Sequence, residues 1–223
     1  AIPWRFRGGL AVILALLITP LEAGTARATP AANEFLVQAG GEVLVGLILG
    51  LGVLLLFSAL QVAGELVSQM SGMQLAAAIT PGGGAARVPI ISKLLFFVTL
   101  AVFLSIGGHR QVLAALLDTF DWLPAGQATF SGSMTAAVTS VLAQSFELGI
   151  RAAAPVMVAL FLATLILGIV ARTLPQLNLM TLGFGLNAMV ALLALGVSIG
   201  AIAWLFQDQL SPILQTVLVA LRG

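Results

Sequence analysis

The feature that most limits the folds open to this chain is a series of long apolar runs that are almost free of charge. They cover residues 35–63, 90–106, 134–171 and 179–206. A helix of roughly 20 apolar residues is long enough to cross the hydrocarbon core of a bilayer, and it satisfies its own backbone hydrogen bonds there. The runs therefore predict an all-α membrane protein.

The composition supports this class and argues against others. Hydrophobic residues make up 60% of the chain and charged residues 8%, with a mean hydropathy of +1.15, which argues against a soluble enzyme. The formal net charge is +1 and the basic residues stand singly, so no nucleic-acid partner is predicted. The chain has no cysteine, which removes disulfides, thiolate metal sites and cysteine nucleophiles together.

The first residues have two interpretations. Arg5 and Arg7 precede an apolar run over residues 8–18, which ends just before Pro20. A basic start, a short apolar core and small residues further on also occur in signal peptides. We favour the alternative, in which this run is the remaining part of a membrane helix in a chain shortened at its N-terminus.

The run over residues 35–63 is longer than one crossing requires. Glu42 lies in its first turns and Glu65 just beyond its end. Three glycines in the run have the spacing of close helix contacts in membranes, but they equally fit average membrane composition, so both interpretations stay open: Gly46, Gly50 and Gly52.

After Glu65 the chain becomes less apolar, and no spanning helix is predicted up to residue 92. This stretch contains Met70, Met73, Pro81 and the consecutive Gly82, Gly83 and Gly84. A phosphate cradle is rejected because no Lys-Ser/Thr pair follows the glycines. Two interpretations remain: a flexible loop, or an apolar seal whose methionines and glycines fill a pore and move aside.

His109 is the only histidine and follows the helix predicted over residues 90–106. No second histidine or cysteine accompanies it, so a polar cap at the helix end is favoured over a metal site. Residues 113–117 and the turn around Trp122 are predicted to form a short helix at the membrane interface.

The run over residues 134–171 is too long for one crossing and carries ionisable residues. Glu147 and Arg151 stand four residues apart, with the acid first, and are predicted to neutralise each other on one helix face. Ionisable residues inside apolar helices mark a contact between helices or a transport pathway, and we favour the contact. Pro155 is expected to kink or break the helix.

Amides, glycines and a proline separate this run from the last one. The stretch contains Pro175, Gln176, Asn178 and Gly183. Backbone interrupted by a proline is tolerated at membrane depth only where protein covers it, so we predict a packing joint within an assembly. A separate, shorter helix over residues 213–221 is expected after the last run.

Several motifs, taken in order, resemble the FliR/SctT family of type III secretion export gates, and the resemblance covers nearly the whole chain. The matching residues are Ile2-Pro3 with Arg5 and Arg7, Gly64-Glu65, Gly72, Pro81, Gly108-His109, the turn from Phe120 to Pro124, Ala154-Pro155, the stretch from Pro175 to Asn178, and Gly183-Phe184. The chain departs from the family where Thr80, Gly185 and Asn187 replace an expected aspartate, proline and lysine. Gly108-His109 and the Leu-Pro turn are more similar to the flagellar branch than to the virulence branch.

The resemblance implies a fold and a role. The fold would be a membrane protein of long broken helices and helical hairpins, in which a FliP-like part (roughly residues 1–150) is fused to a FliQ-like part (151–223) and the first family helix is missing. The role would be that of a structural, non-enzymatic subunit without a cofactor, in the bacterial inner membrane at the flagellar basal body. The implied partners are FliP-like and FliQ-like gate subunits, FlhB-like and FlhA-like export proteins, the lipid membrane, and the unfolded polypeptides that are exported.

Two sets of candidate residues follow. In the family, the loop aligned with residues 72–88 plugs the closed pore, which implies a gate role for Gly72, Met73, Pro81, Gly82, Gly83, Gly84 and Val88. The residues expected to serve packing within the assembly are Glu65, Glu147, Arg151, Pro155, Pro175, Gln176, Asn178 and Gly183. No catalytic or metal-ligating residue is predicted.

Two other classes of function stay open. A small secondary transporter or ion channel would use the break at Pro175 as a substrate site and Glu147 or Glu65 as a proton carrier. An intramembrane enzyme is less favoured, because His109 has no recognisable nucleophile or metal-ligand partner in the sequence.

Overall fold

The computed structural model describes residues 3–22, 32–72, 90–123, 132–173 and 179–221. The regular elements within these ranges are all α-helices, which confirms the predicted all-α class. They are α1 (Trp4–Glu22), α2 (Ala32–Met70), α4 (Ile90–Ser105), α5 (Gly108–Trp122), α6 (Gly132–Thr173) and α7 (Leu179–Leu221).

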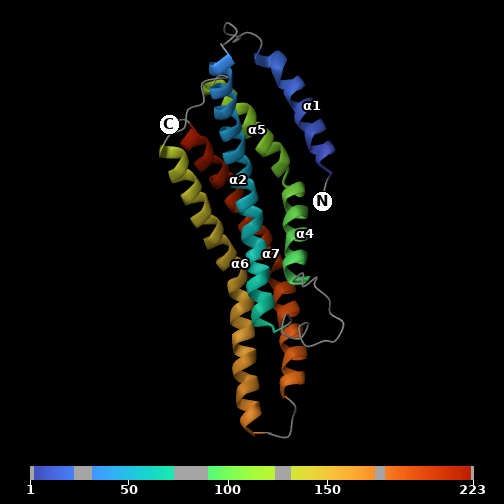
Figure 1. Cartoon of the computed structure of the whole chain (residues 1–223). Coiled ribbons are helices and arrows are strands. Elements are labelled where there is room, and N and C mark those ends of the chain that lie inside the picture. The colour runs from blue at the N-terminus through green and yellow to red at the C-terminus, as the bar shows by residue number, and fades with distance from the viewer. Residues whose placement is uncertain (1–2, 23–31, 73–89, 124–131, 174–178, 222–223) are drawn as a thin grey trace.

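Helix α2 runs through the middle of a long bundle (Figure 1). It packs against α4, α6 and α7, and α6 and α7 also pack along each other as an antiparallel hairpin. The hairpin projects beyond the end of α2 at the bottom of the view, whereas α1 lies at the side of the bundle. The core of the chain is therefore built around α2 rather than around its first helix.

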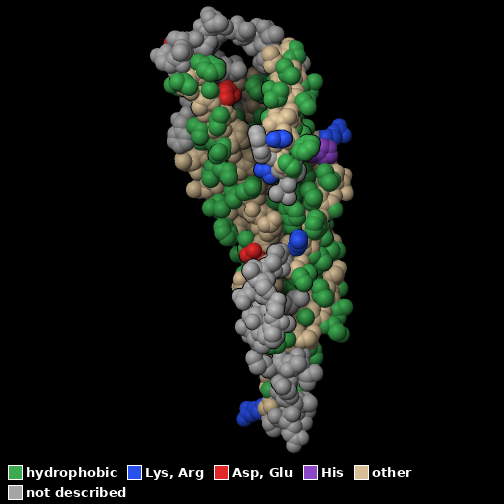
Figure 2. All heavy atoms as spheres, turned by 45° about the vertical axis from the view of Figure 1, so that its right-hand side comes forward, with side chains coloured by type: hydrophobic (Ala, Val, Ile, Leu, Met, Phe, Trp, Pro, Cys, Tyr) green, Lys and Arg blue, Asp and Glu red, His purple; other side chains and the backbone are tan. Residues whose placement is uncertain are grey.

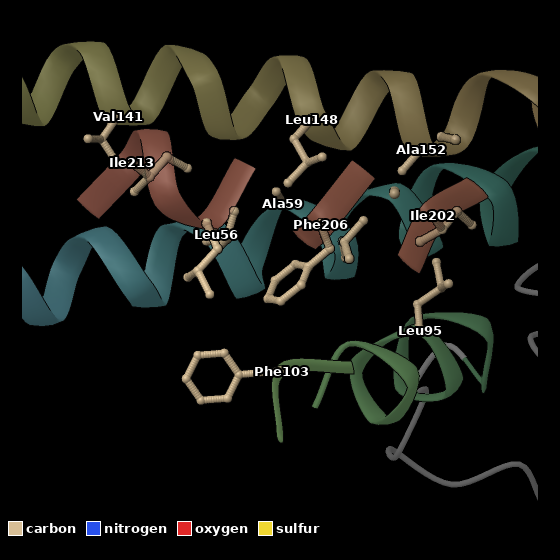
Figure 3. Packing of buried hydrophobic residues seen from close by; sticks show 14 of the residues in the cluster. Leu56, Ala59, Leu95, Phe103, Val141, Leu148, Ala152, Ile202, Phe206 and Ile213 are labelled. Atoms are coloured by element: carbon tan, nitrogen blue, oxygen red, sulfur yellow. The ribbon is translucent and has the colours of Figure 1, made fainter. Parts of the chain in front are cut away.

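The core lies where α2, α4, α6 and α7 meet (Figure 3). Phe206 of α7 is fully buried there, among Leu56 of α2, Leu95 of α4 and Leu148 of α6. The ring of Phe57 meets that of Phe206 edge to face, with centroids 5.6 Å apart. Edge-to-face contacts add to the area that such rings bury, so Phe206 joins all four helices at one point.

Small residues let α2 approach two of its neighbours closely. A Cβ atom added at Gly64 would lie 2.5 Å from the Cα of Ser92 in α4, and one added at Gly149 of α6 would lie 2.7 Å from the carbonyl oxygen of Ala59. The Ser92 hydroxyl also donates a hydrogen bond to the carbonyl of Gln61, at 3.2 Å. Backbone-to-backbone contact of this kind is how helices associate when surrounding lipid gives no hydrophobic drive.

The three glycines whose spacing indicated a contact face, Gly46, Gly50 and Gly52, differ in what surrounds them. An added Cβ at Gly46 or Gly50 would meet nothing within 4 Å, whereas one at Gly52 would lie 3.2 Å from Cγ2 of Val217 in α7. Within this chain, the contact interpretation therefore holds for Gly52 and not for Gly46 or Gly50.

Two glycines make the sharp joint between α4 and α5, whose axes differ by 64°. Gly107 has a φ of 68°, a left-handed conformation that L side chains rarely adopt, and a Cβ at Gly108 would collide with the ring of Phe103. The short interfacial helix predicted over residues 113–117 is in fact the longer α5, and His109 lies exposed in its first turn rather than at the end of α4.

Helix α2 is longer than predicted. It continues to Met70, so Glu65 lies inside the helix with its side chain exposed, and not beyond its end. Ala63 and Val67 on either side of Glu65 are buried. The face of α2 that packs in the core therefore continues beyond residue 63, where the apolar run ends. Packing on one face sustains a helix whose other face is polar.

Two of the long helices each continue past a proline. Pro155 lies inside the single helix α6, and Pro212 lies inside α7, so residues 213–221 are the end of α7 and not a separate helix. A proline removes one backbone hydrogen bond, but buried residues hold the helix on both sides of it. They are Ala153 and Val156 around Pro155, and Leu210 and Ile213 around Pro212. Figure 1 shows a change of direction along α6 between its yellow and orange halves, which fits the kink predicted for this helix.

Within the described ranges, three helices are long and apolar enough to cross a membrane, or four if the bent pair of α4 and α5 counts as one span. Helix α6 has 42 residues, which corresponds to roughly 63 Å at 1.5 Å per residue, about twice the hydrocarbon thickness. The continuous helix is therefore longer than a single crossing requires.

The close approach of α2 to α4 generates a prediction. Gly64→Ala should lower the free energy of unfolding by about 1–3 kcal/mol, because the added methyl meets backbone that cannot move aside, and the thermal midpoint in mild detergent should fall. Gly46→Ala on the same helix is the matched control and should leave the midpoint unchanged or raise it slightly, because alanine favours helix. Equal midpoints for the two variants would contradict the contact.

Candidate functional site

Many of the predicted gate and joint residues lie outside the described residues: Met73, Pro81, Gly82, Gly83, Gly84 and Val88, and also Pro175, Gln176 and Asn178. The structure does place the residues that flank them. Gly72 follows the end of α2, and Gly183 lies in the second turn of α7. These two positions mark where each predicted segment meets the bundle.

Gly72 closes α2 in a left-handed conformation, with a φ of 72°. The amide of Ser71 still donates to the carbonyl of Val67 four residues back (2.9 Å). That of Gly72 donates to the carbonyl of Gln69 three residues back (3.1 Å), so the last turn tightens. Ser71 is fully buried, and its hydroxyl donates to the carbonyl of Ser68 at 2.9 Å. A glycine in this conformation is a common way to end a helix. The end of α2 therefore explains why a glycine stands at position 72.

Phe184 is a site residue that sequence reasoning named only as part of a motif. Its ring lies against Gly72, so that a Cβ at Gly72 would be 2.8 Å from Cδ1 and 2.9 Å from Cε1. The neighbouring Gly183 faces α6, where its Cβ would lie 3.8 Å from Cδ1 of Leu167. The Gly183-Phe184 pair therefore fixes the start of α7 against both α6 and α2. Nothing in the local sequence indicates this long-range contact.

Glu147 and Arg151 form the ion pair that their spacing predicted, with 2.6 Å between Arg151 Nη2 and Glu147 Oε1. Both side chains are more than half exposed, at 57% and 58%. The intervening Leu148 is buried in the core, so the pair lies on the outer side of α6. The exposed Phe146 beside it makes this a mixed apolar and charged surface.

The other predicted packing residues do not gather around this pair. Glu65 is exposed near the end of α2, and Pro155 is exposed on α6 one turn beyond Arg151. Figure 2 shows the same dispersal on one face of the molecule, where apolar side chains predominate and charged ones occur singly or in small groups. Among the described residues, no three His, Cys, Asp or Glu side chains come close enough to hold a metal ion.

Two grooves flank the outer side of α6. One, of about 250 Å³, lies between α2 and α6 and is almost entirely apolar, with Val62, Leu142 and Phe146 among its lining residues. The other, of about 850 Å³, is open and lies between the first turns of α6 and the last turns of α7, with Ser140 and Gln215 in its lining. Both are hollows between helices and hold no cluster of reactive groups in the part of the chain described.

Long apolar helices with apolar outer faces define a helical membrane protein. The chain belongs to the family described as bacterial export proteins, family 1, whose sequence pattern matches residues 1–213. This confirms the resemblance to the FliR/SctT family.

Relatives in several bacteria carry the name flagellar biosynthetic protein FliR. The chain is 32% identical to that of Bacillus subtilis (strain 168) over 197 residues, which are 86% of this chain and 75% of the relative. It is 29% identical to that of Escherichia coli (strain K12), over 87% of this chain and 76% of the relative. The protein of Caulobacter vibrioides is also 29% identical, over 96% of this chain and 85% of its own length. These matches place the chain among components of the flagellar export apparatus.

The exposure of the ion pair generates a prediction about the isolated chain. Glu147→Gln should change the free energy of unfolding by less than about 1 kcal/mol, because pairs that reach solvent contribute little. Leu148→Ala, at the adjacent buried position, should cost about 2–5 kcal/mol. Thermal unfolding in mild detergent compares the two. A loss from Glu147→Gln as large as that from Leu148→Ala would mean that the pair belongs to the core.

Proposed function

We propose that this chain is a structural subunit of a protein export gate in the bacterial inner membrane, at the flagellar basal body. It forms, with FliP-like and FliQ-like chains, a pore through which unfolded polypeptides leave the cytoplasm, and it works beside FlhB-like and FlhA-like export proteins. The observation that carries the proposal is the exposed apolar surface along the hairpin of α6 and α7, in a chain of this family.

The length of the hairpin argues for protein partners. At roughly 63 Å, α6 exceeds the hydrocarbon layer by about 30 Å. Large apolar side chains are exposed on both sides of the Glu147–Arg151 pair, including Leu142 and Phe146 before it and Val158 and Leu165 after it. Lipid can cover only part of such a surface, because the helix is longer than the lipid layer. Other helices must cover the remainder.

The ion pair favours this function over a transporter. A proton-carrying carboxylate inside a membrane is expected to face the protein interior or a water-filled cavity. Glu147 is instead paired with Arg151 on the outer side of α6, and Glu65 is exposed on α2. Both carboxylates are therefore better suited to contacts with neighbouring chains.

We further propose that the segment which starts at Gly72 seals the closed pore. Support comes from its Met73, Pro81 and three glycines, which combine deformable apolar side chains with backbone freedom. Partner contacts are proposed for Pro175, Gln176 and Asn178, between α6 and α7. The division into a FliP-like part (roughly 1–150) and a FliQ-like part (151–223) would fall inside α6, so the two parts would share that helix.

Native mass spectrometry of the complex tests the proposal. The full-length protein is purified after co-expression with FliP-like and FliQ-like chains from the same genome. One copy of this chain in a single large assembly is the expected result. A stable protein that never associates with those chains, and that moves solutes when reconstituted alone in liposomes, would overturn the proposal in favour of a transporter.

The sealing role generates a separate prediction. Deletion of residues 82–84, which removes the proposed glycine hinge, should leave assembly intact but should make vesicles that contain the complex leaky to protons. A pH-sensitive dye inside the vesicles measures the leak. Deletion of residues 127–129, three residues from another segment between helices, serves as the matched control for shortening the chain. Vesicles that stay proton-tight after removal of the glycines would contradict a seal.

A further inference from the structure

The contact between Gly72 and Phe184 joins two parts of the chain that are far apart in the sequence. Gly72 is the residue by which the chain leaves α2, and Phe184 lies in the second turn of α7. Two independent constraints act on Gly72. Its φ of 72° disfavours any L side chain, and the Phe184 ring leaves no room for a Cβ atom.

Different substitutions act on these two constraints. Asparagine adopts left-handed backbone more readily than other L residues. An asparagine at position 72 therefore adds less backbone strain than any other L residue would. It still carries a Cβ atom, which the Phe184 ring would meet at 2.8 Å. A small residue at position 184 removes the second constraint and leaves the first.

The surroundings hold Phe184 in place against the end of α2. Gly183 lets the start of α7 approach Leu167 of α6, so α7 is supported by a second helix next to Phe184. On the α2 side, Val67 and Ser71 are buried and their backbone groups are hydrogen-bonded to each other. Neither partner of the contact can therefore shift without disturbing packed neighbours.

We infer that Phe184 is a positioning residue, whose ring fixes the direction in which the chain leaves α2 and so couples the end of α2 to the start of α7. The inference adds a residue pair to the proposed export gate but rests only on contacts within this chain. A displacement of the first turns of α7 is transmitted to Gly72 by the ring, because the ring and the glycine backbone are already in contact.

The absence of cysteine in the chain allows a direct test. Ser71→Cys places a thiol at a fully buried position next to Gly72, and its rate of maleimide labelling in the purified full-length protein reports local opening. Phe184→Ala should raise that rate about tenfold, and Phe184→Leu, which keeps much of the bulk, should raise it less. Ser145→Cys, buried in the middle of α6, is the matched reporter and should label at an unchanged rate.

A double-mutant comparison separates positioning from general loosening. Gly72→Asn should speed labelling of the Ser71→Cys reporter when Phe184 is present and add little when Phe184 is alanine. Independent, multiplicative effects of the two substitutions would overturn the inference, and so would an unchanged rate in Phe184→Ala. If Phe184→Ala speeds labelling of the Ser71→Cys and Ser145→Cys reporters equally, the inference is also overturned, because Phe184 would then serve the stability of the whole bundle. Because these measurements use the isolated chain, their failure is distinct from failure to assemble with partner chains.

Discussion

Close approach of the backbones at Gly64 and Gly149 is the constraint on which the rest of this bundle depends. Helix α2 meets α4 at Gly64 and α6 at Gly149, in both cases at distances that exclude even a methyl group. In lipid, apolar area gives little drive for helices to associate, so close packing through small residues supplies it. Once α2, α4 and α6 are held together, α7 packs against all three, and Phe206 fills the space between them. Gly72 and Phe184 meet because this bundle holds the end of α2 and the start of α7 next to each other.

The sequence predicted the helices well because their cause is local. Runs of apolar residues with few charges predicted α2, α4, α6 and α7 near their observed positions. The spacing of Glu147 and Arg151 predicted their ion pair. Predictions failed where distant packing outweighs a local tendency. The separate helix expected over residues 213–221 is the end of α7, because buried side chains on both sides of Pro212 hold the helix against the loss of one hydrogen bond.

Contacts across the sequence were the part that could not be predicted. Gly46 and Gly50 have the spacing of a packing motif but face open space, whereas Gly64 and Gly149 make the close contacts. Spacing alone does not reveal which helix face a neighbour will occupy. The same limit applies to Gly72 and Phe184: each was singled out as a motif residue, but only the folded chain brings them together. Motifs that look separate in the sequence can therefore be two halves of one contact.

The polarity of α6 varies along its axis as well as around it. Its first half exposes Thr135, Ser140 and Glu147 among apolar neighbours. The large side chains exposed in its second half are mostly apolar, such as Val158, Leu165 and Ile169, until Arg172 near its end. A helix about twice as long as the hydrocarbon layer needs such a gradient, because only one half can be immersed in lipid. The ion pair lies in the first half, where Gln144 also donates a hydrogen bond to Ser140. The apolar second half is thus suited to lipid, and the mixed first half, with its small side chains and adjoining grooves, is suited to contact with other protein helices.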